Sequence, residues 1–93
     1  MEKTQTATAD YSFRMTVTLS SSQCARIIYM ALIREVENPP SYRSRAVLHR
    51  EGDSVVLEIF SNDLSSFRAA INSYLRLLAA TLSVLDETKN LLE

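Results

Sequence analysis

The 93-residue chain is long enough for one domain with a thin hydrophobic core, and 46% of its residues are apolar. Its 10 basic and 11 acidic side chains nearly cancel, which disfavours intrinsic disorder and gives no overall charge that would attract nucleic acid or an anionic membrane. One cysteine, one glycine and no long apolar run argue against a disulfide framework, a glycine-rich phosphate loop and a membrane span. We therefore expect a cytoplasmic protein with a flexible tail over 1–9 and a single domain over 10–93.

The first predicted element is a strand from Tyr11 to Leu19, where apolar and polar residues alternate as in a half-buried strand. The serines at 20–22 can cap the first turn of a helix, and Asn38-Pro39-Pro40 ends it. This helix is apolar around most of its circumference, which is more than a surface helix needs. Its apolar residues are Ala25, Ile28, Leu32 and Val36, flanked by Ile27, Tyr29, Met30 and Ile33.

Two further strands are predicted, from Tyr42 to Arg50 and from Ser54 to Phe60, with Gly52 supplying the positive φ of a short hairpin turn. The third strand is the more apolar and should be central, whereas the arginine-rich second strand fits an edge. One face of this hairpin should carry Ala46, Leu48, Val55, Leu57 and Ile59. The opposite face should carry Arg43, Arg45, Val47 and His49, with Val56, Glu58 and Phe60.

The last predicted element is a long helix from Leu64 to Leu92, capped by Ser61-Asn62-Asp63 and free of glycine and proline. Its apolar residues recur at close to heptad spacing. The first stripe is Leu64, Phe67, Ile71, Tyr74, Leu78, Leu85 and Leu92; a second is Ala70, Leu77, Val84 and Leu91, and Leu75 and Leu82 widen the surface further.

The element order strand, helix, strand, strand, helix predicts an α+β fold. The simplest arrangement is a three-stranded antiparallel sheet of order 1-3-2, with both helices packed on one face and a right-handed crossover through the first helix.

Such a sheet needs only one apolar stripe from each helix, and the last helix, at about 42 Å, is longer than strands of about 25–30 Å. The surplus apolar surface predicts association by self-pairing, by a partner's helices, or by both, unless the chain buries it in a way the pattern does not reveal. The predicted partner-binding residues are Ile28, Leu32, Phe67, Ile71, Tyr74, Leu75, Leu78, Leu82 and Leu85.

The chemically reactive side chains do not form a recognisable site. His49 has no nearby nucleophile, carboxylate or second metal ligand in the sequence, so we interpret it as a solvent-facing strand residue. Cys24 lies in a first helical turn, where a thiol pKa is lowered, but packing is the simpler role. The sequence therefore predicts no enzyme, cofactor, metal or small-molecule substrate. A basic group could contact phosphates or could simply solubilise an edge and a helix: Arg43, Arg45, Arg50, Arg68 and Arg76.

The run from Asp63 to Leu75, Asp-Leu-Ser-Ser-Phe-Arg-Ala-Ala-Ile-Asn-Ser-Tyr-Leu, resembles the small dimerising subunit of the KEOPS complex. That family, which includes the cancer/testis-antigen-like proteins, opens its final helix with an acidic-polar cap, Leu/Phe-Arg-Ala and then Asn-Ser. The matching positions are Asp63, Phe67, Arg68, Ala69, Asn72 and Ser73. The hairpin with Gly52 at its tip and the strand–helix opening also resemble the family, whereas the linker at 37–40 departs from it.

The resemblance implies a non-catalytic homodimer that uses both helices to bind the N-terminal helices of the catalytic, ATPase-fold subunit. The complex makes threonylcarbamoyladenosine in tRNA, and the small subunit joins two catalytic arms and helps hold tRNA. A structural or tRNA-facing role is implied for Arg68 and Asn72, and less directly for Arg76; Arg43 and Arg45 are our further candidates. Two alternatives stay open: a free-standing nucleic-acid-binding module, and a paralogous accessory subunit that pairs with the dimeriser.

Overall fold

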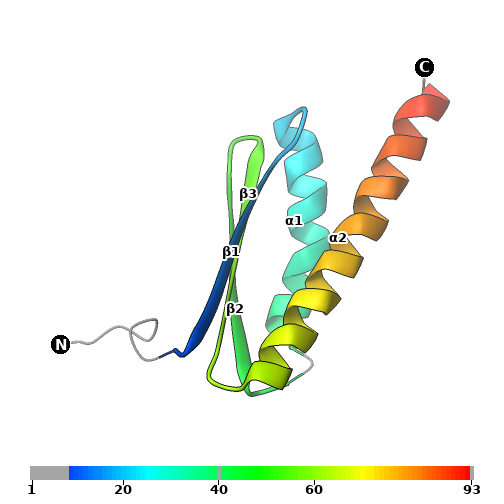
Figure 1. The fold of residues 1–93 in the computed structure, drawn as a ribbon. Helices are drawn as coiled ribbons and strands as arrows, with labels where there is room; N and C mark the ends of the chain where they lie inside the picture. Colours follow the sequence, from blue (N-terminus) through cyan, green and yellow to red (C-terminus); the bar gives the residue numbers. More distant parts are fainter. Residues whose placement is uncertain (1–8, 40, 93) are drawn as a thin grey trace.

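The computed structural model describes residues 9–39 and 41–92, with side chains through Thr88, so most of the predicted tail over 1–9 lies outside it. The elements are β1 (Tyr11–Thr18), α1 (Ser22–Glu37), β2 (Ser44–Glu51), β3 (Ser54–Ser61) and α2 (Leu64–Leu92). The three strands form an antiparallel sheet of order β1-β3-β2, and both helices lie on the same side of it (Figure 1). The predicted α+β architecture is confirmed.

The sheet register follows from the alternation of apolar residues. Met15 of β1 and Leu48 of β2 both lie opposite Leu57 on the central strand. Glu51 pairs with Ser54, so the hairpin turn is the two residues between them, and Gly52 has the positive φ of 59° that this turn requires. Side chains alternate between the two faces of a strand. This register therefore places Leu48, Val55, Leu57 and Ile59 on the face toward the helices, together with Ala46, as predicted.

Side-chain caps fix where both helices begin. The Ser21 Oγ accepts a hydrogen bond of 3.1 Å from the backbone N–H of Cys24 at the start of α1. At the start of α2, the Asp63 Oδ2 accepts one of 2.9 Å from the N–H of Ser66. Each cap satisfies a backbone donor that has no partner within its helix. Asn38 ends α1, with its backbone and side-chain nitrogens both donating to the Arg34 carbonyl.

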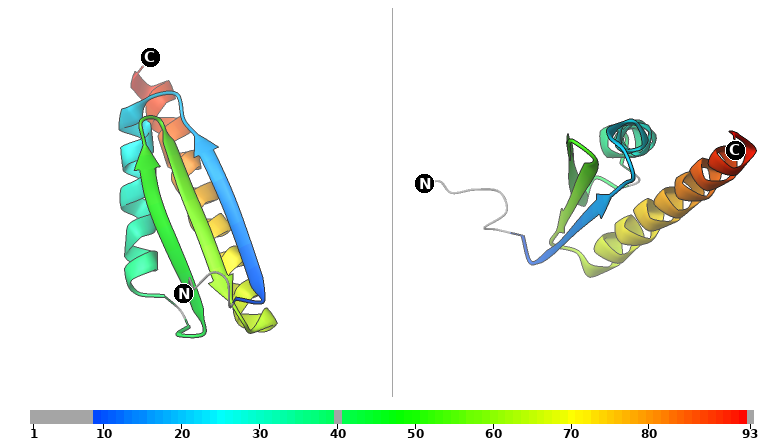
Figure 2. Two further views of the ribbon diagram at one scale, coloured as in Figure 1. Left: turned by 90° about the vertical axis from the view of Figure 1, so that its left-hand side faces the viewer. Right: turned by 90° about the horizontal axis from the view of Figure 1, so that it is seen from above.

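Both helices cover the same face of the sheet, and the core lies between that face and the helices (Figure 2). Its buried side chains come from α1, β3 and α2, and β2 adds one more. They are Ala25, Ile28, Leu32, Leu48, Val55, Leu57, Ile59, Ala70, Tyr74 and Leu78. Beyond Leu78, no side chain of α2 described up to Thr88 is fully buried, because the helix runs away from the sheet toward its C-terminus (Figures 1 and 2).

The other face of the sheet holds two apolar side chains that are more deeply buried than their position on an open face would suggest. Val56 and Phe60 are 5% and 8% exposed. The guanidinium carbon of Arg45 lies 5.1 Å from the centroid of the Phe60 ring, so the arginine covers the ring with its own side chain. The predicted facing of these residues is confirmed, and the cover over Phe60 comes from Arg45, its partner across the strand pair.

Candidate functional site

Four of the predicted partner-binding residues belong to this chain's own core. Ile28, Leu32, Tyr74 and Leu78 are at most 7% exposed and pack between the helices and the sheet. Their apolar side chains are already covered within one chain, so they position the helices and offer a partner almost no surface. Helical periodicity could identify them as apolar but could not tell which of several apolar stripes faces the sheet.

The remaining predicted residues lie at the margin of the core. Phe67, Ile71, Leu82 and Leu85 are half-buried against it, and Leu75 is 40% exposed. The Phe67 ring stacks on Tyr11 of β1, with centroids 5.6 Å apart. On the two helices, four more large apolar side chains that the partner-binding prediction omitted are also exposed: Ile27, Met30, Leu64 and Val84. The helix surfaces therefore keep apolar area that the single chain does not cover.

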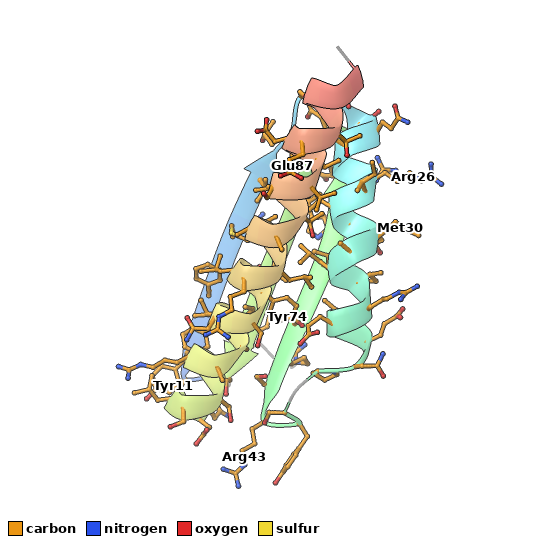
Figure 3. All side chains as sticks on the ribbon, turned by 90° about the vertical axis from the view of Figure 1, so that its right-hand side faces the viewer. Tyr11, Arg26, Met30, Arg43, Tyr74 and Glu87 are labelled. Carbon is orange, nitrogen blue, oxygen red and sulfur yellow. The ribbon has the colours of Figure 1, made fainter. Side chains whose placement is uncertain are left out.

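Among the described residues, the Tyr74 hydroxyl is the one buried side-chain nitrogen or oxygen for which no hydrogen-bond partner is found. The Tyr74 side chain is 2% exposed and lies in the core between the helices (Figure 3). Burial raises the pKa of Tyr74 to about 12, and the negative charge of Glu35 on α1 adds to the rise. The phenol is therefore held neutral in the folded chain well above the pH at which an exposed tyrosine ionises.

The Tyr74→Phe variant is expected to be at least as stable as the wild type at pH 7, because the change removes a buried hydroxyl that lacks a partner. The wild type should lose stability as the pH rises from about 10 toward 12, since the unfolded tyrosine gives up its proton before the folded one does. Thermal melts across this range should show a smaller decline for Tyr74→Phe. Equal declines for the two proteins would contradict the assignment.

The residues predicted to face tRNA fall into two groups. Arg68, Asn72 and Arg76 are all exposed on α2. Arg43 and Arg45 lie at the start of β2, at the end of the molecule where α2 begins, and Figure 3 shows Arg43 there. Nothing in the described contacts joins the two groups, so a nucleic acid that touched both would have to extend from the sheet end along the helix.

The second group borders a hollow of about 210 Å³ on the sheet end. Its lining is Ala9, Tyr42, Arg43, Ser44, Arg45, Phe60, Ser61 and Asn62. Sequence reasoning missed Tyr42 and Asn62 as members of this site. A tyrosine next to two alternating arginines was the available signal, but only the folded chain shows that the ring is 89% exposed.

Hydrogen bonds through Ser61 tie this hollow to the start of α2. The Ser61 hydroxyl donates to the Arg43 carbonyl at 2.8 Å and accepts from the Asp63 N–H at 3.0 Å. The Arg43 Nη1 lies 3.9 Å from the Asp63 Oδ1, a distance at which a solvent-exposed pair contributes little. Hydrogen bonds from the side chain and backbone of Ser66 lower the pKa of Asp63, and Arg43 lowers it further.

The two other reactive side chains, His49 and Cys24, lie on different elements, β2 and α1. His49 is exposed on the open sheet face, as predicted, and Cys24 is half-buried with its Sγ 3.8 Å from the Ser20 Oγ. Among the described residues, no three His, Cys, Asp or Glu side chains gather as a metal site would require. Neither helix, over the part the structure describes, is long and apolar enough to cross a membrane.

Comparison with known proteins agrees with this architecture. The family model described as "Transcription factor Pcc1" matches residues 12–86. The KEOPS complex subunit Pcc1 of Pyrococcus abyssi (strain GE5 / Orsay) is 37% identical over 73 residues, which are 78% of this chain and 89% of that protein. A chain of the crystal structure of the binary complex Gon7–Pcc1 has the same fold, with a TM-score of 0.71 at 12% identity over 87% of this chain and 99% of that one. This chain belongs to the Pcc1 family.

Proposed function

We propose that this chain is a non-catalytic scaffold subunit of a KEOPS complex. It pairs with a second copy, joins two catalytic threonylcarbamoyltransferase subunits through its helices, and helps to hold the tRNA that the complex modifies. The observation that carries this proposal is the 37% identity with a protein named as the KEOPS complex subunit Pcc1. The cytoplasmic location is proposed with it, because the single cysteine gives no sign of an oxidising compartment.

The helices supply the surface for a catalytic partner. α2 has 29 residues and is therefore about 44 Å long, whereas the eight-residue strands span only about 27 Å. The exposed apolar side chains on α2 are Leu64, Leu75 and Val84, and those on α1 are Ile27 and Met30. Helices of a partner could cover these side chains by the same ridge-and-groove packing that holds helices together in a core.

The margin of the sheet at β1 is the surface that best fits a second copy. On the central strand, the side chains that face the helices, such as Val55, Leu57 and Ile59, are fully buried. The corresponding side chains of β1, Tyr11 to Val17 at alternate positions, are all only half-buried. Because β1 is an edge strand with partly uncovered apolar side chains, a second chain would bury area there that one chain leaves open.

The proposal is tested by recovering the assembly from its native source with tagged wild-type chain and with the Leu75→Asp/Val84→Asp double variant. Both side chains are exposed, at 40% and 60%, so the variant should fold as the wild type does. We expect at least about a tenfold loss of recovered catalytic subunit, since each carboxylate would be buried without a partner.

The matched control is Ser65→Asp/Ser83→Asp, which adds the same charge to exposed positions of α2 without removing apolar area. It should recover the catalytic subunit as well as the wild type does. If the catalytic subunit were retained by Leu75→Asp/Val84→Asp, the helix-binding role would be wrong. Light scattering on the pure chain tests self-pairing, and a clean monomer at micromolar concentration would remove the homodimer from the proposal.

A further inference from the structure

The hollow at the start of β2 combines an exposed aromatic ring with two cations. We call it the Tyr42 corner and define it by Tyr42, Arg43, Arg45, Phe60 and Asn62. Tyr42 is 89% exposed, the largest exposed fraction among the large hydrophobic side chains of the described residues. A tyrosine left this open contributes almost nothing to the stability of its own chain, because burial is the source of most of its stabilising effect.

The guanidinium groups of Arg43 and Arg45 each lie near an aromatic ring, and both side chains are exposed to solvent. The Arg43 guanidinium is 5.8 Å from the Tyr42 centroid, and the Arg45 guanidinium is 5.1 Å from the Phe60 centroid. Phe60 is 8% exposed and forms the floor under Arg45. A guanidinium that rests on a ring keeps its N–H groups at the ring's edge, where they can donate to a phosphate.

The carboxylate that pairs with Arg43 is shared with the cap of α2. One Asp63 oxygen is 3.9 Å from Arg43, but the Asp63 carboxylate also caps α2, where its Oδ2 accepts from the Ser66 N–H at 2.9 Å. Asp10 also lies beside the corner, where its backbone N–H donates to the Asn62 Oδ1 at 2.7 Å. This bond fixes the Asn62 side chain at the rim.

We propose that the Tyr42 corner binds one unpaired nucleotide of an RNA, with the base stacked on the Tyr42 ring and the adjoining phosphate held by Arg43 and Arg45. The choice of RNA as ligand rests on the proposed role in tRNA modification. The combination of ring and cations is what single-stranded nucleic acid requires, because every base has a stacking face and every linkage a negative charge. The hollow, at about 210 Å³, is smaller than the sites that enclose a whole cofactor.

Two other ligands fit the corner less well. A duplex offers phosphates but keeps its base faces stacked on one another, so the Tyr42 ring would gain no contact. An acidic peptide would pair with the arginines but has no flat ring system to cover a tyrosine that is 89% exposed. Both are therefore used as competitors in the test.

The test measures fluorescence anisotropy of a labelled, unstructured single-stranded RNA decamer with the full chain at low salt. Tyr42→Ala should weaken binding about fivefold or more, as expected for one lost base-stacking contact, whereas Tyr42→Phe keeps the ring and should bind as the wild type does. Arg45→Ala should weaken binding and make the slope of log K against log salt shallower by about 0.7, the value for one phosphate on a single strand. Arg26→Ala, an exposed arginine of α1 outside the corner, is the matched control and should change neither quantity.

The corner is not an RNA site if the wild type fails to bind, if Tyr42→Ala binds as the wild type does, or if Arg26→Ala weakens binding as much as Arg45→Ala. Equal competition by duplex RNA or by a glutamate-rich peptide of the same charge would also overturn the proposal. The nucleotide site and the scaffold role can be disproved independently of each other. A chain that recovers the catalytic subunit but does not bind the decamer would lose only the nucleotide site, and the reverse result would remove only the scaffold role.

Discussion

The Leu78→Asp variant is expected to unfold in isolation, whereas Leu75→Asp, three residues earlier on the same helix, should stay folded. Leu78 is 7% exposed and packs in the core, while Leu75 is 40% exposed. An aspartate at 78 would lose the apolar burial of leucine and place a carboxylate where no cation or hydrogen-bond donor replaces water. The combined loss of several kcal/mol approaches the total stability of a domain this small.

Far-ultraviolet circular dichroism and thermal melts of both variants would check this expectation. The Leu75→Asp chain should melt cooperatively within about 5 °C of the wild type, a shift equivalent to about 1 kcal/mol in a chain of this length. The Leu78→Asp chain should show no cooperative transition. If the two variants melted alike, α2 would not be oriented with Leu78 toward the sheet.

The Leu32→Ala variant is expected to lose about 2–5 kcal/mol of unfolding free energy, the range observed when a fully buried leucine is truncated. Leu32 is 1% exposed and lies in the cluster that joins α1 to the sheet. Truncation leaves a cavity that the neighbouring side chains fill only in part, because the sheet and both helices hold them in place.

Ile27→Ala is the matched control for Leu32→Ala, since Ile27 is an aliphatic residue of the same helix and is 43% exposed. Its truncation should lower the unfolding free energy by less than about 1 kcal/mol, because much of the side chain is already in water. Urea titrations of both variants give the two values directly. A loss from Ile27→Ala as large as that from Leu32→Ala would mean that α1 is rotated about its axis relative to the structure.

These two comparisons separate the residues that hold the chain together from those that are available to a partner. Within α2, Leu78 belongs to the core and Leu75 to the surface, although the sequence places both among the apolar residues of the same helix. The distinction changes how the scaffold role must be tested. A charge at Leu78 would release any partner simply by unfolding the chain, so only exposed positions such as Leu75 and Val84 can report on an interface.

Several features of the fold could be predicted from local sequence because local chemistry decides them. The strict alternation from Tyr11 onward defines a strand with one half-buried face, and Gly52 allows the two-residue turn that sets the hairpin register. The cap of α2 by Asp63 is a local contact, since the backbone N–H that donates to its carboxylate belongs to Ser66, three residues away. The apolar third strand had to be central because it carries apolar residues on both faces.

The element order, the helix caps, the hairpin turn and the surplus of apolar surface on the helices follow from the amino-acid sequence, because each depends on residues close together in the chain. Which side chains of α2 meet the sheet depends on the tertiary packing: Tyr74 and Leu78 of the first stripe are buried together with Ala70 of the second, whereas Leu75 between them stays 40% exposed. The tertiary packing also decided the Tyr42 corner, where residues from β2, the end of β3 and their neighbouring loops meet. Contacts between distant segments depend on packing geometry, which no local period encodes.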